Sequence, residues 1–368
     1  MKKLFFFLIV SLPLIMGACS SDDDKDENDF IVPELTEGNS IQYTFVPGSK
    51  LETSIGAAGN KIAIDWGDGK VDKCLEMVNA TNFTHKYDKA GTYQIKIWSE
   101  GLTSLSLFEW GGTSTKLGIG QSPNMTKLRI EDFNDLTSLK VSNCPNLTEF
   151  YIINCDNLTS LDLSECTSLD EVECNNNKLK TLNVSTCRSL TKLICSYNEI
   201  TGLDLRNNSN IRNLNCDRNK LTALDIRGLR SLQTLNCYDN ELTDLYLADA
   251  TLLRLLVCGV NKISTLDVQH NKALINLMCA NNELTSLTLA ASTSILELYC
   301  GTNRLEASNL NTIFNALPVH KEEGNEEEHN HGSDYYRIQI KGNPGTDGCD
   351  TGIITDKGWT IIDEEVIP

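Results

Sequence analysis

Seven cysteines recur at an unbroken interval of 21 residues, from Cys174 to Cys300. Seven asparagines follow them three positions later at the same interval, from Asn177 to Asn303. An interval kept without a slip over this distance indicates that each unit folds in the same way and stacks on its neighbours. The chain is therefore expected to build an elongated stack of coils.

The unit that begins at Leu190 shows how one coil is expected to form. Side chains alternate across a strand, so Leu193 and Cys195 should point inward while Lys192 and Ile194 point outward. The inward Asn198 can both donate and accept, and is expected to satisfy backbone groups where the chain leaves the strand. One coil buries too few apolar side chains to offset its loss of conformational entropy, so coils must stack.

The frame Leu-x-x-Leu-x-Cys-x-x-Asn resembles the leucine-rich repeat, and two Leu-x-x-Leu-x-Leu halves within 21 residues resemble its bacterial IRREKO-type subclass. Half-repeats continue upstream at 11 residues. The resemblance implies a solenoid with parallel strands over residues 101–310. Equivalent cysteines in stacked coils have Cβ atoms about 4.8 Å apart, which is too far for a typical disulfide. We expect free core thiols there, including those that take the asparagine position: Cys144, Cys155, Cys166 and Cys187.

The chain begins with two lysines and an apolar run that ends at Gly17-Ala18-Cys19. This pattern is typical of a signal peptide over residues 1–18. The small residues before Cys19 resemble the bacterial lipobox, which implies cleavage there and acylation of the Cys19 thiol. Residues 19–30 form an acidic tether that resembles the surface-export signal of Bacteroidetes lipoproteins. We therefore expect a lipid anchor in the outer membrane and exposure on the cell surface.

Residues 31–100 are expected to form a separate module, with strands at 41–45, 61–65 and 92–98. Two motifs, Asp65-Trp66-Gly67-Asp68-Gly69 and His85-x-Tyr87-x-x-x-Gly91-x-Tyr93, together resemble the PKD domain, an immunoglobulin-like β-sandwich. Gly67 and Gly69 suit a tight turn. Asp68 and His85 are expected to form hydrogen bonds in the turn and the core rather than to bind a ligand. The module should cover the open edge of the first coil.

Residues 311–368 are expected to cap the other end. A short helix is predicted over 308–317, an acidic loop over 321–334, and strands over 335–340 and 359–362. The loop contains His329 and His331 beside a run of glutamates, but its composition favours a solvated segment over a metal site. The predicted fold is therefore mainly β: an immunoglobulin-like sandwich, a leucine-rich repeat solenoid and a short cap.

Composition narrows the function. Fifty acidic against 32 basic residues give a net charge of −18, which disfavours nucleic acid as a partner. The sequence contains no hydrolase, metalloprotease or phosphate-loop motif, and its five histidines are scattered. We therefore expect a monomer that is not an enzyme, without cofactor or metal.

Outward positions in the C-terminal coils suggest a binding surface. Apolar and aromatic residues occur there in successive units, and they form the predicted partner-binding strip: Tyr238, Leu255, Val257, Met278 and Tyr299. Such residues are typical of the centres of protein interfaces, although pairing between neighbouring strands favours the same residue types. A protein ligand is the first interpretation and a glycan, taken up by a polysaccharide-import system, the second. Should the strip serve only strand pairing, the alternative site is the column Asp204, Asp225 and Asp267.

Overall fold

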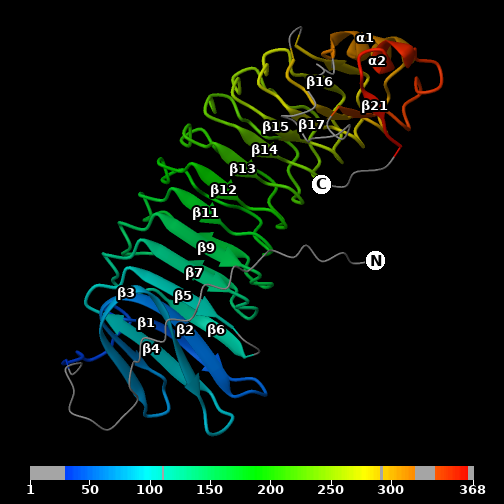
Figure 1. Cartoon of the computed structure of the whole chain (residues 1–368). Helices are drawn as coiled ribbons and strands as arrows, with labels where there is room; N and C mark the ends of the chain where they lie inside the picture. Colours follow the sequence, from blue (N-terminus) through cyan, green and yellow to red (C-terminus); the bar gives the residue numbers. More distant parts are fainter. Residues whose placement is uncertain (1–29, 110–111, 291–292, 320–335, 364–368) are drawn as a thin grey trace, which may run out of the picture.

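The computed structural model describes residues 30–109, 112–290, 293–319 and 336–363. These residues form a curved, elongated solenoid with a β-unit at the N-terminal end and two short helices at the other (Figure 1). The predicted signal peptide, the lipidation site Cys19, the tether up to residue 29 and the acidic loop 321–334 lie outside the described residues. Within the described ranges, no helix has the length and apolar character needed to span a membrane.

The N-terminal unit is antiparallel. It contains β1 (Ile41–Val46), β2 (Glu52–Asp65), β3 (Val71–Lys86) and β4 (Tyr93–Ser99). β2 pairs with β3 along most of its length and with β4 near its end, and β4 pairs with β1. The strands predicted at 41–45 and 92–98 are confirmed. The strand predicted at 61–65 is the end of the much longer β2, and β3 was missed.

The N-terminal unit joins the solenoid through its sheet. β5 (Ser104–Phe108), the strand of the first coil, pairs antiparallel with β2 on one side and parallel with β7 (Lys127–Glu131) on the other. The two backbone segments approach closely at Gly59, where a Cβ atom would lie 2.3 Å from the Gly101 carbonyl oxygen. β6 (Thr113–Gly118) pairs back onto β1. The unit thus covers the open edge of the first coil, as predicted.

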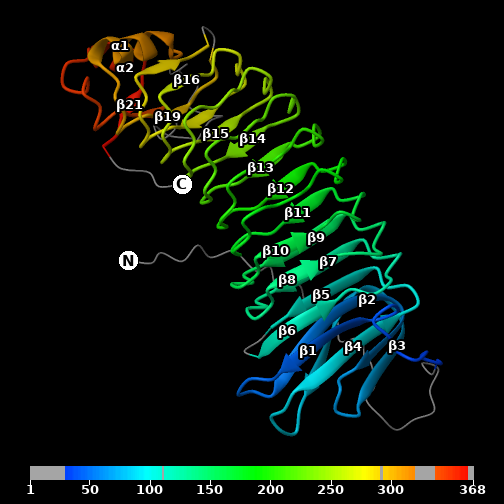
Figure 2. The same ribbon diagram turned by 180° about the vertical axis from the view of Figure 1, so that it is seen from behind.

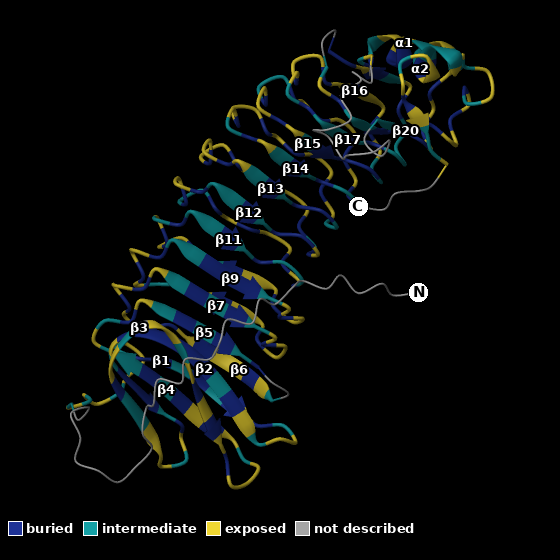
Figure 3. Ribbon diagram, in the orientation of Figure 1, coloured by how far each residue is buried: buried dark blue, intermediate teal, exposed yellow. Residues whose placement is uncertain are grey.

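Beyond β7 the strands stack in parallel and in register, so that Leu193, Leu214 and Leu235 are direct partners. They are β9 (Glu149–Ile153), β11 (Glu171–Glu173), β12 (Lys192–Ile194), β13 (Asn213–Asn215), β14 (Thr234–Asn236), β15 (Leu255–Val257), β17 (Asn276–Met278) and β19 (Glu297–Tyr299). We call the outer surface of these strands the sheet face. Buried and partly exposed residues alternate along it (Figure 3).

Among the described residues, the opposite side of the coils forms four short strands, of which β8, β10 and β16 can be seen in Figure 2. β8 (Ser138–Lys140) pairs with β10 (Ser160–Asp162), and β16 (Thr265–Asp267) pairs with β18 (Ser286–Thr288). Elsewhere on this side the described backbone is not assigned to a strand, but the inward leucines are still present. Leu203 and Leu224, for example, are buried. The predicted second strand-like half is therefore confirmed in part.

The seven regularly spaced cysteines lie in the core and are fully buried. All thirteen cysteines of the described residues are free thiols. Burial raises the pKa of Cys195, Cys237 and Cys300 to about 12, so these thiols are protonated at neutral pH. The interpretation of the cysteines as small core residues is confirmed.

The C-terminal cap begins with α1 (Ala307–Ala316), which confirms the short helix predicted over 308–317 and buries Leu310, Ile313 and Phe314. β20 (Arg337–Gln339) pairs with β19, and β21 (Thr360–Ile361) pairs with β20 after the short α2 (Gly352–Thr355). The cap therefore continues the stack by one coil, which the sequence analysis treated only as closing strands.

Candidate interaction surfaces of the solenoid

The buried asparagine column ties each coil to the one before it. In a central coil, Asn219 Nδ2 donates to the carbonyls of Cys195 at 3.0 Å and Cys216 at 3.1 Å. Its Oδ1 accepts the Ile200 amide at 3.0 Å. The same pattern holds from Asn198 to Asn303. The predicted role of these side chains as partners of the backbone is confirmed.

The backbone adopts a left-handed conformation two residues after each cysteine of this series. The φ angles lie between 50° and 58° in seven successive coils, at Asn176, Tyr197, Arg218, Asp239, Val260, Asn281 and Thr302. Each amide in this column then donates to a carbonyl of the next coil where one follows, as from Val260 to Ala280 at 3.0 Å. Left-handed φ is costly for most side chains and least so for asparagine, so the turn is held by contacts between coils.

The same turn carries one charge per coil on its outer side, and we call it the paired corner. The charges alternate in sign over seven coils: Lys178, Glu199, Lys220, Glu241, Lys262, Glu283 and Arg304. Ion pairs join Glu199 to Lys220 at 3.0 Å and Glu241 to Lys262 at 2.9 Å. Glu283 and Arg304 form a third pair at 2.8 Å. The sequence analysis missed this column, although its 21-residue interval was visible.

The sheet face changes character along the stack. Over the N-terminal coils its charges are paired: Lys127 with Glu149 at 2.8 Å, and Lys192 with Glu173 at 2.6 Å. Tyr151 donates its hydroxyl hydrogen towards the carboxylates of Glu149 and Glu171, at 3.0 and 3.1 Å. These groups satisfy one another, which leaves little free charge for a partner to recognise.

Over the next coils the sheet face is uncharged. The outward residues of β13, β14, β15 and β17 are Asn213, Asn215, Thr234, Asn236, Leu255, Val257, Asn276 and Met278. Val257, Met278 and Tyr299 are direct partners in successive strands, so the predicted strip is continuous there. Leu255 and Met278, both members of this strip, are half-buried, with their side chains partly open to solvent. Charge returns at Glu297, which pairs with Arg337 at 2.6 Å.

Two members of the strip are less exposed than strand alternation predicts. Val257 and Tyr299 are each 4% exposed. Strands about 4.8 Å apart place outward side chains against those of both neighbours, and this contact removes most of their accessible surface. Tyr238 is half-buried because its ring lies against Gly259, where a Cβ atom would be 3.4 Å from the ring. The expectation that Val257 and Tyr299 face water is therefore wrong, while Leu255 and Met278 keep accessible surface.

The alternative aspartate column has a local role in its turns. Asp204 Oδ1 accepts the Arg206 amide at 3.1 Å, and Asp225 and Asp267 repeat this bond two residues on. The Arg206 guanidinium also donates to Asp204, and these bonds lower the pKa of Asp204 to about 2. The carboxylates of this column are thus engaged in hydrogen bonds within their own turns.

The two N-terminal motifs meet in space. His85 Nε2 lies 2.9 Å from Asp68 Oδ2, and the His85 ring stacks on Trp66 with centroids 4.8 Å apart. The Tyr87 hydroxyl donates to the Trp66 carbonyl at 3.1 Å. Asp68 and His85 therefore hold the turn and the core together, as expected.

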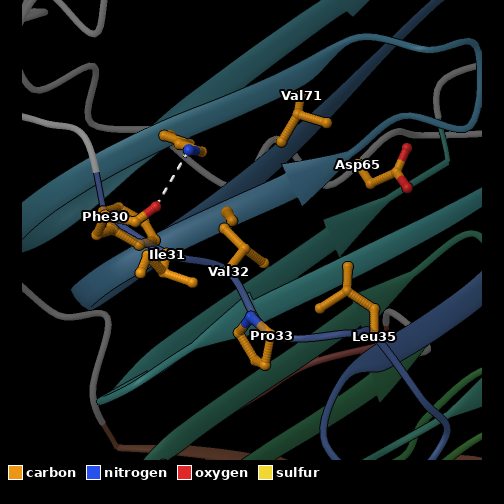
Figure 4. A pocket seen from close by; sticks show the side chains of 9 residues that line it. Phe30, Ile31, Val32, Pro33, Leu35, Asp65 and Val71 are labelled. Atoms are coloured by element: carbon orange, nitrogen blue, oxygen red, sulfur yellow. Dashed lines mark hydrogen bonds between the residues drawn. The ribbon is translucent and has the colours of Figure 1, made fainter.

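An open hollow of about 520 Å³ lies on the outside of this unit, between the segment 30–35 and strands β2 and β3 (Figure 4). Lys73 Nζ donates to the Phe30 carbonyl there at 3.1 Å. None of the residues predicted to bind a partner lines it. Across the described ranges, no group of three or more His, Cys, Asp or Glu side chains is placed to hold a metal ion.

Fold and sheet face together define the class: a mainly β solenoid of stacked parallel strands, built from a leucine-rich frame. No protein-family model matches the chain, and no curated protein matches it. Among solved structures it is similar to the functional domain of InlJ from Listeria monocytogenes, which includes a cysteine ladder, with 29% identity and a TM-score of 0.44. That match covers 61% of this chain and 43% of the InlJ chain, so this chain spans less than half of it.

Two further solved structures show more distant similarity. An internalin (inlF) from Listeria monocytogenes is 19% identical, with a TM-score of 0.47, and the match covers 72% of this chain and 87% of that one. YopM from Yersinia enterocolitica is 22% identical, with a TM-score of 0.45, and the match covers 67% of this chain and 50% of that one.

Proposed function

We propose that the chain is a non-enzymatic, lipid-anchored surface protein whose sheet face binds a protein partner through β14, β15, β17 and β19. The uncharged, partly apolar stretch of sheet face carries this proposal. It lies between regions where every described charge on the face is paired, and it presents the partly exposed apolar side chains of Leu255 and Met278, of which methionine is a residue type enriched at interfaces. A partner with an apolar centre would bury Leu255 and Met278 without desolvating an unpaired charge.

The anchor and the module belong to the same proposal. The lipobox and the acidic tether support acylation of Cys19 and a place on the outer face of the outer membrane. The joined Trp66, His85 and Tyr87 motif supports a PKD-like module that separates the solenoid from the membrane. The antiparallel pairing of β2 with β5 supports its role as the cap of the first coil.

A column-matched variant tests the binding face. Leu255→Asn and Met278→Asn introduce the residue that already stands at equivalent positions, Asn276 and Asn236, so the stack should keep its melting temperature. A partner isolated with the intact chain should bind the double variant more weakly by at least about 1 kcal/mol per site. Tyr246→Asp is the control, because Tyr246 is 54% exposed and belongs to the aspartate column on the other side of the coil.

Equal affinity of the intact chain and the double variant, with equal stability, would place the partner elsewhere. Surface exposure is tested separately by protease treatment of intact cells. Release of the solenoid is expected, and protection until the outer membrane is broken would contradict surface exposure without bearing on the sheet face.

A further inference from the structure

Five successive coils each carry one exposed cation without an acidic partner at the turn that precedes a strand of the sheet face. We call this turn the cationic corner, and its cations are Arg188, Arg212, Arg230, Arg254 and Lys272. Within the described parts of the chain, the side chains of these five form no ion pair or hydrogen bond, and the contact that a neighbouring side chain makes here, from Asn210 Nδ2 to Arg188 at 3.1 Å, is to the backbone carbonyl. Five such cations are unexpected in a chain with a net charge of −18.

The cations alternate between two columns. Arg188, Arg230 and Lys272 are 42 residues apart in one column, and Arg212 and Arg254 are 42 residues apart in the other. Each column thus places a cation in every second coil, and the two together place one in every coil. This zigzag keeps like charges apart along a corner where stacked positions are about 4.8 Å from one another.

Backbone hydrogen bonds fix both columns. The turns close through bonds such as Leu232 N to Leu229 O at 3.1 Å. The amides of Arg212 and Arg254 donate to Thr191 and Gln233 of the preceding coils, at 2.8 Å in both cases. The cations therefore stand at regular intervals along about 20 Å of the stack.

Nearby acids are already engaged. Asp204 and Asp225 pair with Arg206 and Arg227 at 2.6 and 2.7 Å. Asp249 accepts the Gly228 amide at 3.0 Å. The five cations of the corner thus face solvent as a row of uncompensated positive charge.

We propose that the cationic corner binds a linear anionic polysaccharide. One cation per coil, at about 4.8 Å, is comparable with the length of one sugar unit in an extended chain. Most positions between the cations carry hydroxyl and amide side chains that suit sugar hydroxyls: Ser189, Ser209, Asn210, Gln233 and Thr251. Leu252, which is 51% exposed, is an apolar exception whose side chain suits the apolar face of a sugar ring. This site is separate from the sheet face and does not depend on the function proposed for it.

Other polyanions fit less well. An extended acidic peptide gains affinity by pairing with free backbone groups, whereas the corner amides of Arg212 and Arg254 are bonded from coil to coil. Single-stranded nucleic acid binds through aromatic side chains that stack on its bases, and the described turn positions from Arg188 to Leu190, Asn208 to Arg212, Leu229 to Gln233, Ala250 to Arg254 and Asn271 to Ile275 hold no aromatic residue. Both remain outcomes of the test.

The test measures binding of the full chain to polygalacturonate, with its fully methyl-esterified form as the uncharged probe. Arg212→Gln combined with Arg230→Ser introduces the residues found at equivalent positions, Gln233 and Ser209. Affinity for polygalacturonate should fall about tenfold or more and become less salt-dependent. The control Arg206→Ser combined with Arg227→Ala removes the same charge from paired arginines, copies Ser185 and Ala248, and should change affinity less than about twofold.

Preference for polygalacturonate over the esterified form, together with loss in the first variant alone, supports the proposal. An equal loss of affinity in both variants would show that binding depends on net charge alone, and would overturn the proposal. Equal or tighter binding of poly-glutamate or single-stranded DNA would also overturn it, as would failure of the unmodified chain to bind polygalacturonate at low salt.

Discussion

Each coil turns at two corners, and these corners differ in their inward residues and in their surface charges. At the paired corner every coil from Asn198 to Asn303 has the same inward asparagine, buried or half-buried, and the surface charges alternate and pair. At the cationic corner the inward position varies, from Cys187 to Asn208, Leu229, Ala250 and Asn271. Its row of five unpaired cations has one sign within the described residues, although the turns also carry the Asp204–Arg206 and Asp225–Arg227 pairs and Asp249.

The difference separates what holds the stack from what the stack displays. At the paired corner the inward residue is constant and the charges cancel, so packing and register explain its composition. At the cationic corner the inward residue varies while the outward cations keep a strict interval, and packing does not explain that interval. A row of like charges destabilises the folded chain through electrostatic repulsion, so stability does not account for it. This contrast points to the cationic corner as a surface for a ligand.

The largest expected effect removes the asparagine at the paired corner. Asn219→Ala leaves the Ile200 amide and two carbonyls without their partner, and should destabilise the chain by about 1–3 kcal/mol in denaturant melts. At the cationic corner, Asn208→Leu copies Leu229: it removes the Nδ2 bonds to the Val184 and Cys187 carbonyls at 3.0 and 2.8 Å, but also a buried Oδ1 that has no partner among the described residues, and it leaves no backbone amide without an acceptor. It should therefore cost less than Asn219→Ala, by about 1 kcal/mol. Equal costs at both corners would break the comparison.

A smaller effect, of opposite sign, is expected from relieving the left-handed turn. Val260 has a φ of 53°, a conformation that is unfavourable for a β-branched side chain, and Asn281 stands at the equivalent position of the next coil. Val260→Asn should raise the free energy of unfolding by about 0.5–1 kcal/mol. Thr251→Asn, at an exposed turn position of the cationic corner, is the control and should leave stability unchanged. A Val260 variant that is no more stable would show that the turn is not strained.

The smallest effect tests the charges. Lys220→Glu places three glutamates in successive coils at the paired corner, with Glu199 and Glu241 on either side. It should lower stability by less than half of the Asn219 effect, and the loss should shrink in high salt because the groups are exposed. Arg230→Glu at the cationic corner breaks no ion pair among the described residues and should leave the melting temperature nearly unchanged. A larger loss from Arg230→Glu would assign a structural role to that cation.

Much of the solenoid could be predicted from the sequence because its columns have one physical cause each. The inward Leu193 and Cys195 follow from strand alternation, and Asn198 follows from the need to satisfy backbone groups. The sequence also contains the pattern of the last coil, because Ile338-x-Ile340-x-x-Asn343 repeats the frame after an insertion. Asn343 Nδ2 donates to Cys300 O at 3.0 Å, as in the other coils. It was missed because the interval from Asn303 is 40 rather than 21 residues.

The site was less predictable than the fold. Alternation shows which way Val257 and Tyr299 point, but not how far neighbouring side chains cover them, and both are 4% exposed. The long β2–β3 hairpin was missed because β3 carries polar residues at its open edge, such as Lys73 and Asn79, and lacks a clear period of two. Whether a charge is free or paired depends on distances between coils, so the contrast between the corners emerged only from the structure.

The alternation of the cationic corner has a consequence for how this molecule can change over evolutionary time. Its unit is two coils, since Arg188 and Arg230 are 42 residues apart and Arg212 lies between them. Tandem duplication of such a unit would lengthen the row by two cations and leave both end caps untouched, because each cap contacts only its adjoining coils. A population of such variants would differ in the length of polymer they grasp while keeping the same chemistry of contact, so reach could be selected independently of specificity.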